Sequence, residues 1–167
     1  MSETKVLIGA PGAGKSTVGQ LLAQALECSF VDSDSVIEKN LGMPISEIFI
    51  QESEQYFRKI EKQVVLDLLT NFTGVLSLGG GSVLDEEVQR ELANHLVIWL
   101  QVSLADAVER VGLNQSRPLL LGNVRSNMKN LLTERNHIYQ NLATHIVDAT
   151  NSPQAIVRSI IEKIQVI

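Results

Sequence analysis

The sequence has little cysteine, no excess of positive charge and no long apolar run, and each absence excludes a class of protein. Cys28 is the only cysteine, so a disulfide framework and a cysteine metal site are both excluded. The net charge of −5 argues against a nucleic-acid partner, which calls for a basic face. No apolar run approaches the ~20 residues of a membrane-spanning helix, and the N-terminus lacks a signal-peptide core. We therefore expect a soluble protein of the cytoplasm without a membrane partner.

Metal ligands and domain boundaries are also missing. The three histidines lie on different predicted elements at no metal-ligand spacing. Cys28 follows a helical pattern, which favours a small buried thiol over a reactive one. We find no internal repeat, low-complexity tract or linker, and 167 residues with 44% hydrophobic side chains suit one core. The chain is therefore predicted to form a single domain over residues 1–167.

A glycine-rich motif near the N-terminus is the strongest signal that is present. Gly9-Ala10-Pro11-Gly12-Ala13-Gly14-Lys15-Ser16 fits the phosphate-loop pattern G-x-x-x-x-G-K-[ST] between a strand at 5–8 and a helix at 16–26. Backbone N–H groups of such a loop point at phosphates, and the helix N-terminus adds its positive end. Lys15 would reach the β- and γ-phosphates of a nucleotide, and Ser16 would bind Mg²⁺. A chance glycine-rich turn is the alternative.

Strand and helix patterns alternate after this motif, which predicts a parallel sheet with helices on both faces. A short helix at 36–40 is predicted to be capped by Ser35 and ended by Gly42. The predicted strands cover 5–8, 29–32, 74–78, 95–101 and 144–147, and the other helices cover 45–50, 54–70, 85–94, 103–112, 124–142 and a last one from Pro153. Ligands bind at the carboxyl edge of such sheets. This edge should gather the phosphate loop, Asp32, Asp34, Gly79–Gly81 and Arg58.

Two aspartates and three glycines follow predicted strands. Asp32 is the candidate carboxylate for Mg²⁺, and Asp34 could accept a proton from a hydroxyl nucleophile or orient it. Helix capping is the alternative for both aspartates. Gly79-Gly80-Gly81 permits close backbone approach to a ligand, with a flexible turn as the alternative.

Two arginines indicate an anionic substrate. Arg135 falls within an apolar helical stripe that contains Met128, Leu131, Leu132, Tyr139 and Leu142. A guanidinium there needs an anion, either a ligand or an internal acid such as Glu61. Arg58 lies one turn into a helix whose predicted apolar side contains Phe57, Ile60, Val64 and Leu68. The alternative to a ligand-binding role is that Arg58 lies on a solvated face of this helix. Beside two aspartates, the arginines suggest a small substrate with a carboxylate and hydroxyls.

The segment from Gly112 to Gly122 is predicted to be a loop with Arg117-Pro118 in its middle and Leu119-Leu120-Leu121 after them. Three leucines in a polar loop should not face water permanently. A lid that closes over the substrate would bury them and bring Arg117 to the phosphates. The alternative is that the leucines begin the next helix and pack statically.

These motifs together resemble the shikimate kinase family of phosphate-loop enzymes. The resemblance covers nearly all of the chain. It rests on Gly9–Ser16, Asp32-Ser33-Asp34, Phe57-Arg58 with Glu61, Leu78–Gly81, Arg117-Pro118-Leu119, and Arg135 four residues before Tyr139. It implies a three-layer α/β/α fold, a five-stranded parallel sheet of order 2-3-1-4-5 and a lid at about residues 112–123. The implied reaction moves the γ-phosphoryl group of ATP to the 3-hydroxyl of shikimate, in the pathway to chorismate and the aromatic amino acids.

The resemblance also implies residue roles. Asp34 would contact the shikimate hydroxyls, Arg58 and Arg135 would hold its carboxylate, and Gly80 with its neighbours Gly79 and Gly81 would offer N–H groups. Lys15, Asp34 and Arg117 are the implied catalytic set, and Ser16 and Asp32 would support Mg²⁺. The implied nucleotide-binding residues are Gly12, Ala13, Gly14, Lys15, Ser16, Thr17, Arg110, Arg117 and Pro153. The family often has Arg-x-Pro-Leu-Tyr where this chain has Arg135-Asn136-His137-Ile138-Tyr139.

Three other functions are alternatives to this one. A kinase for another small hydroxy acid, such as gluconate, would lack the pairing of Arg58 and Arg135 with Asp34. A GTP-binding switch would need an Asn-Lys-x-Asp motif and an Asp-x-x-Gly after the third strand, and the sequence has neither. A catalytically dead paralogue is disfavoured because every expected position is filled. A monomer is expected, with shikimate and ATP as its small-molecule partners.

Overall fold

A five-stranded sheet forms the middle layer of the computed structural model, which describes residues 3–112 and 123–166. The strands are β1 (Lys5–Ile8), β2 (Phe30–Asp32), β3 (Val75–Ser77), β4 (Leu96–Gln101) and β5 (His145–Asp148). All pairs are parallel, and the order across the sheet is β2-β3-β1-β4-β5. Both the parallel sheet and the strand order implied by the resemblance are confirmed.

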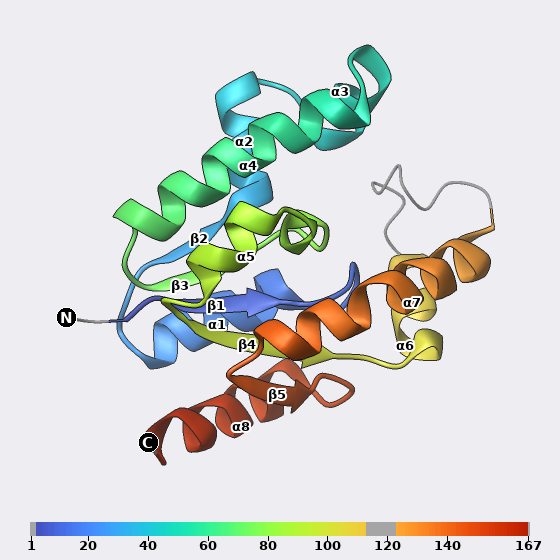
Figure 1. Cartoon of the computed structure of the whole chain (residues 1–167). Helices are drawn as coiled ribbons and strands as arrows, with labels where there is room; N and C mark the ends of the chain where they lie inside the picture. Colours follow the sequence, from blue (N-terminus) through green and yellow to red (C-terminus); the bar gives the residue numbers. More distant parts are fainter. Residues whose placement is uncertain (1–2, 113–122, 167) are drawn as a thin grey trace.

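Helices connect the strands and cover both faces of the sheet (Figure 1). They are α1 (Lys15–Ala25), α2 (Ser33–Leu41), α3 (Ile45–Gln51), α4 (Glu54–Asn71), α5 (Glu86–Leu92), α6 (Leu104–Gly112), α7 (Val124–Leu142) and α8 (Pro153–Gln165), with a short 3-10 helix η1 at Ser82–Leu84. Pro153 begins α8, as predicted. The predicted lid lies almost wholly outside the described residues.

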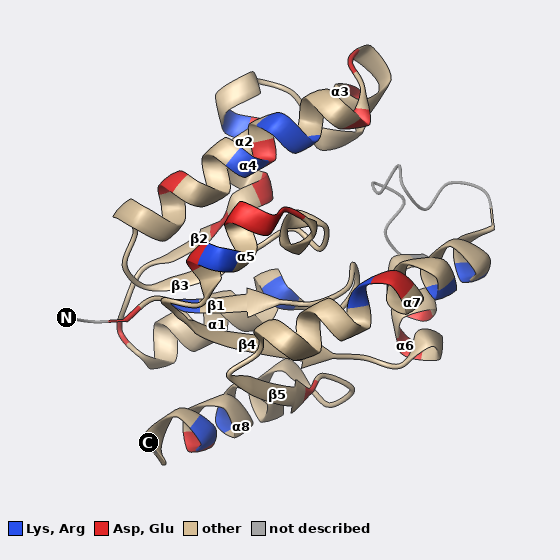
Figure 2. Cartoon of the chain, in the orientation of Figure 1, with Lys and Arg blue, Asp and Glu red and all other residues tan. Residues whose placement is uncertain are grey.

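Successive side chains of a strand point to opposite faces of the sheet, so alternate strand residues pack into two different hydrophobic clusters. Leu7 and Ile98 face a cluster with side chains of α1, α6, α7 and α8. Val6, Ile8 and Trp99 face the opposite cluster, with side chains of α4, α5 and α7. Strands buried on both faces explain why β3 and β4 carry no charged residue, and Figure 2 shows charge mainly on the helices.

A third and smaller cluster lies apart from the sheet. Ile37 of α2, Ile48 of α3 and Phe57 of α4 are its buried members. These three helices stand together at one end of the molecule in Figure 1. The cluster thus holds the start of α4, with Arg58, in a fixed place relative to α2.

The start of α2 corrects the predicted cap. The helix begins at Ser33 rather than Val36, and its N-cap is Asp32 rather than Ser35. Asp32 Oδ1 accepts the N–H groups of Asp34 at 2.9 Å and Ser35 at 3.2 Å. A carboxylate directly at the end of β2 accepts two N–H groups of the first helical turn, so the helix begins immediately after the strand, without an intervening loop. Asp34 therefore lies in the first turn of a helix.

The buried side of α4 also differs from the predicted one. The buried residues are Phe57, Glu61, Val65 and Leu69, spaced by four, whereas Ile60, Val64 and Leu68 are only partly buried. The helix lies between two clusters, with Ile60 and Val64 against the smaller one and Leu68 against the sheet cluster. The most buried side chains of α4 lie between these two sets of contacts, and they include the ionisable residue Glu61.

Cys28 is exposed, so the prediction of a buried thiol is wrong. Helix α1 ends in a turn where Glu27 has φ 53° and the Cys28 N–H donates to the Ala23 carbonyl at 2.9 Å. This turn leads the chain off the helix before β2 begins, which leaves the thiol at the surface. Within residues 3–112 and 123–166, no helix combines the length and apolarity that a membrane crossing needs.

Replacement of Gly19 by alanine should destabilise the fold although alanine is the better helix former. Gly19 is buried on α1, and a Cβ there would overlap the ring of Phe30. Overpacking costs roughly 1–3 kcal/mol and outweighs the ~1 kcal/mol gained in helix propensity. Denaturant unfolding of Gly19→Ala should show this loss. The control Gln20→Ala, at an exposed neighbouring position, should change the free energy of unfolding by less than about 0.5 kcal/mol.

Candidate active site

A pocket of about 270 Å³ opens at the carboxyl edge of the sheet, where the sequence places the candidate residues. Its lining comes from the phosphate loop, the β2–α2 junction, α3, α4, the glycine segment after β3, and α7. The candidate residues among them are Ser16, Asp32, Asp34, Arg58, Gly79, Gly80, Gly81 and Arg135. The topology thus gathers residues that are up to 124 positions apart, since Pro11 and Arg135 both line the pocket.

The phosphate loop connects β1 to α1 through left-handed glycines. Gly12 has φ 81° and Gly14 has φ 85°, conformations that side chains with a Cβ rarely adopt. Gly14 is the N-cap of α1, and no side chain occupies the cap position. The helix N-terminus is therefore open to an anion, as the motif predicts.

Lys15 follows the loop backbone with its side chain. Its ammonium donates to the carbonyls of Gly9 at 2.8 Å and Ala10 at 3.0 Å, and the residue is only 8% exposed. The positive charge is therefore held at the base of the loop, on the side where β1 ends.

Arg110 of α6 contacts the same loop from outside. Its guanidinium donates to the carbonyls of Gly12 at 3.3 Å and Ala13 at 3.4 Å, and to that of Ala149 at 2.6 Å. Ala149 directly follows β5, and Pro153 begins α8 four residues later. Arg110 thus links the phosphate loop to the segment between β5 and α8. Thr17 is exposed in the first turn of α1, and Arg117 lies outside the described residues.

Asp32 makes two kinds of contact with its two carboxylate oxygens. Oδ1 caps α2, while Oδ2 accepts the hydroxyl hydrogen of Ser16. The capping alternative is therefore true for Asp32, and it leaves the second oxygen beside the phosphate loop. Hydroxyl and carboxylate oxygens are ligands that suit Mg²⁺. No group of three or more metal-binding His, Cys, Asp or Glu side chains occurs in the described ranges, so an ion here would draw its other ligands from phosphates and water.

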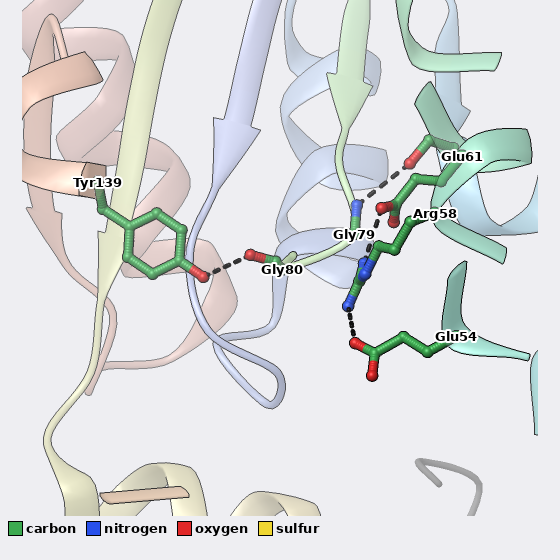
Figure 3. A network of polar contacts seen from close by, with 7 residues as sticks. Glu54, Arg58, Glu61, Gly79, Gly80 and Tyr139 are labelled. Atoms are coloured by element: carbon green, nitrogen blue, oxygen red, sulfur yellow. Dashed lines mark hydrogen bonds and ion pairs between the residues drawn. The ribbon is translucent and has the colours of Figure 1, made fainter. Parts of the chain in front are cut away.

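Gly79, Gly80 and Gly81, called here the glycine segment, are fixed by hydrogen bonds from both sides. The Gly79 N–H donates to Ser33 Oγ at 3.1 Å, and the Ser82 N–H donates to the Gly79 carbonyl at 3.0 Å. The Tyr139 hydroxyl donates to the Gly80 carbonyl at 2.7 Å (Figure 3). These bonds argue against a flexible turn.

The absence of side chains lets other groups approach the glycine segment. A Cβ at Gly79 would lie 2.7 Å from Asp34 Oδ1, and one at Gly81 would lie 2.5 Å from the Arg58 guanidinium nitrogens. Because Ser33 already accepts the Gly79 N–H, the donors that remain at the pocket belong to Gly80 and Gly81. Neither of these two N–H groups bonds to another backbone group of the described residues.

Arg58 is oriented by an ion pair on its own helix. Its guanidinium lies 2.7 Å from Glu61 Oε1 and 3.7 Å from Glu54 Oε1 (Figure 3). The Glu61 side chain is only 4% exposed and that of Arg58 24%, so Arg58 does not lie on a solvated helix face. The sequence reasoning considered Glu61 as a partner for Arg135, whereas the close partner of Glu61 is Arg58.

The environment of Glu61 shifts its protonation. Burial raises the pKa of Glu61 above its usual 4.5, against the opposing effects of Arg58, Ser82 and Arg135. The neighbouring positive charges therefore do not fully compensate the loss of water around this carboxylate.

Arg135 is buried without a close anion. It is 4% exposed within the line Met128, Leu132, Arg135 and Tyr139 on α7. Its Nε has no hydrogen-bond partner, and the described residues form no ion pair with it. One of its guanidinium nitrogens would lie 3.4 Å from a Cβ at Gly80, so the charge faces the glycine segment and the pocket. A buried guanidinium of this kind favours an anionic ligand.

Sequence reasoning missed two hydroxyl groups at this site. The sequence places Ser33 between two candidate aspartates and Tyr139 in an apolar stripe and a family motif, and neither hydroxyl is assigned a role from the sequence. The position of Ser33 between two candidate ligands, and of Tyr139 one helical turn after Arg135, are the signals that could have indicated them.

The shikimate kinase family model matches residues 11–165 of this chain. A shikimate kinase of Thermobifida fusca is 49% identical over 145 residues, which are 87% of this chain and 84% of that protein. A shikimate kinase of Mycobacterium avium is 46% identical over 98% of this chain and 94% of that protein. A solved shikimate kinase of Acinetobacter baumannii, in complex with shikimate, superposes with a TM-score of 0.94 at 31% identity, over 99% of this chain and 94% of its own.

The raised pKa of Glu61 predicts a pH dependence that a Glu61→Gln variant reveals. A raised pKa means that the folded state favours the protonated carboxyl, so this contribution to stability is present at low pH and is lost as the pH rises through the folded pKa above 4.5. The free energy of unfolding of the wild type minus that of Glu61→Gln should therefore decrease from pH 4 to pH 7. Urea unfolding at several pH values measures it. A difference that increases with pH would mean that the ion pair with Arg58 lowers the pKa instead.

Proposed function

The chain belongs to the shikimate kinase family, and on that premise we propose that it transfers the γ-phosphoryl group of ATP to the 3-hydroxyl of shikimate. The observation that carries the proposal is the placement of Arg58, Arg135, Gly80 and Gly81 in one pocket beside the phosphate loop, where the N–H groups of the two glycines bond to no other backbone group of the described residues. The reaction belongs to the pathway to chorismate and the aromatic amino acids.

Recognition of the acid follows from the charges of the pocket. We assign the substrate carboxylate to Arg58, Arg135 and the N–H groups of Gly80 and Gly81, because these donors lie together at one side of the pocket and Arg135 has no carboxylate partner among the described residues. Asp34, in the first turn of α2, lines the same pocket and is assigned to the substrate hydroxyls. The Acinetobacter baumannii relative, solved with shikimate, supports this choice of substrate.

Phosphoryl transfer requires positioning and charge stabilisation more than covalent chemistry. The loop amides and Lys15 would hold the β- and γ-phosphates, and Asp34 would orient the attacking hydroxyl and accept its proton. Ser16 and Asp32 would hold Mg²⁺, which supplies charge neutralisation when it is bound to the nucleotide. The fixed glycine segment keeps the acid end of the substrate in place while its hydroxyl faces the phosphate loop.

The nucleotide base and the lid complete the proposal. Arg110 contacts the phosphate loop and also Ala149, four residues before Pro153, and we assign Arg110 and Pro153 to the adenine end of ATP. Arg117, in the segment at 112–123, is assigned to the phosphates. A single domain over residues 1–167, a monomer and a cytoplasmic location remain predictions, as does the absence of nucleic-acid and membrane partners.

An assay of phosphoryl transfer against a panel of hydroxy acids tests the proposed function. Shikimate should be phosphorylated at its 3-hydroxyl, identified by phosphorus–proton NMR correlation, and gluconate should not react. Lys15→Ala provides the negative control, since the triphosphate charge would lack its partner at the loop. Turnover with gluconate but not with shikimate would replace this function by the alternative.

The two contacts of Asp32 can be separated by two substitutions. Asp32→Asn should keep the cap of α2, because asparagine caps as well as aspartate, yet it should raise the Mg²⁺ concentration needed for half-maximal rate. Asp32→Ala should in addition lose about 1 kcal/mol of folding free energy. Magnesium titrations of the rate and urea unfolding give the two readouts. An unchanged Mg²⁺ requirement in Asp32→Asn would leave the residue as a cap only.

A substrate without its charge tests the two arginines. The methyl ester of shikimate should bind at least about tenfold more weakly than the acid, because a hydrogen bond to a charged partner contributes roughly 1.5–3 kcal/mol. Arg135→Ala should weaken binding of the acid strongly and of the ester much less, as measured by calorimetry. Arg158→Ala, exposed on α8, is the control for loss of one positive charge and should leave both unchanged. Equal losses for acid and ester in Arg135→Ala would make Arg135 structural.

A further inference from the structure

The hydrogen bond between Tyr139 and Gly80 joins a buried phenol to the glycine segment. Tyr139 is fully buried, and its hydroxyl donates to the Gly80 carbonyl at 2.7 Å across 59 residues of sequence. The ring packs in the sheet cluster and lies 5.8 Å from that of Trp99, centroid to centroid. A phenylalanine would fill the same space, so the packing does not explain the hydroxyl.

The bond fixes the direction of the next N–H group. The Gly80–Gly81 peptide is trans, since the described residues contain no cis peptide, and a trans peptide points its C=O and its N–H to opposite sides. With the Gly80 carbonyl turned toward Tyr139, the Gly81 N–H points the other way. That is the side of Arg58, which lies across the glycine segment from Tyr139 in Figure 3.

Helix α7 presents Tyr139 and Arg135 to the same segment. The two residues are four apart and both buried, so they share one face of the helix. A Cβ at Gly80 would lie 3.4 Å from Arg135 and 3.1 Å from the Pro11 ring of the phosphate loop. The Gly80 backbone therefore lies between α7 and the phosphate loop.

We propose that Tyr139 is a positioning residue for the acid substrate: its hydroxyl holds the Gly80–Gly81 peptide so that the Gly81 N–H joins Arg58 and Arg135 at the carboxylate. This assignment rests on the proposed function. Burial raises the pKa of Tyr139 to about 12, against the opposing effects of the Arg135 charge and of a side-chain contact between the phenol and Arg135, so the phenol keeps its proton and remains a donor to Gly80.

Tyr139→Phe removes the hydroxyl and retains the ring. Its dissociation constant for shikimate should rise roughly three- to tenfold, the usual range for one neutral hydrogen bond. The methyl ester should lose less, so the ratio of ester to acid dissociation constants should decrease. The KM for ATP should stay unchanged, because the phosphate loop keeps its own hydrogen bonds. Calorimetry with both ligands and steady-state kinetics give these values.

Two further variants separate positioning from stability. Leu92→Ala destabilises the same sheet cluster without touching the glycine segment, and it should leave the ratio of ester to acid unchanged. Ser33→Ala removes the acceptor of the Gly79 N–H on the opposite side and should lower the ratio as Tyr139→Phe does. If Tyr139→Phe does not fold, an unchanged ratio in Ser33→Ala overturns the proposal, because the fixed glycine segment would then not govern binding of the carboxylate.

An unchanged ratio in Tyr139→Phe, or equal losses of acid and ester, would overturn the proposal and leave Tyr139 as a core residue. Such a result would not affect the proposed function, provided that the wild type phosphorylates shikimate. Failure of the wild type to phosphorylate shikimate would instead contradict the proposed function, whatever the variants show.

Discussion

A buried guanidinium without an internal anion is the constraint on which the site depends. Arg135 is 4% exposed, and among the described residues no carboxylate pairs with it. The nearby Glu61 is committed to Arg58, and burial raises the pKa of this carboxyl, so it offers Arg135 little compensation. Although Asp32, Asp34, Glu38 and Glu61 also line the pocket, none of them forms an ion pair with Arg135 among the described residues. A ligand carboxylate would pair with Arg135, so ligand binding would also remove the loss of stability that an unpaired buried charge causes.

The order of the strands places this charge beside a phosphate site. Strand β1 lies between β3 and β4, so the phosphate loop after β1 and the glycine segment after β3 emerge side by side at one edge. The junction of β2 and α2 follows at the next position and contributes Ser33 and Asp34. Helix α7 closes the site from the opposite face through Arg135 and Tyr139. A parallel sheet forces these segments together, whereas the hydrogen bonds of the glycine segment determine which donors face the ligand.

Sequence patterns predicted the parts of the molecule that depend on local chemistry. The phosphate loop, the strands and the long helix α7 follow from glycine spacing, apolar runs and helical periodicity, and Arg135 within its apolar stripe indicated a buried charge. The partners of side chains were harder to predict. Glu61 was considered as an internal acid for Arg135, but the sequence alone did not decide that its close partner is Arg58. Asp32 and Ser35 are both good caps, and only the end of β2 decides between them. Cys28 is exposed because a turn ends α1 before it, and the helical spacing of apolar residues does not predict that turn.

The free energy of unfolding of Arg135→Met, with and without shikimate, tests the central claim most directly. An unpaired buried charge should destabilise the ligand-free protein. Without ligand, the Arg135→Met variant should therefore be more stable than the wild type by at least about 1 kcal/mol. Shikimate at 100 times its dissociation constant should stabilise the wild type by about 2.7 kcal/mol and the variant far less. A variant that is less stable than the wild type in the absence of ligand would contradict the account, because Arg135 would then have a stabilising partner within the protein.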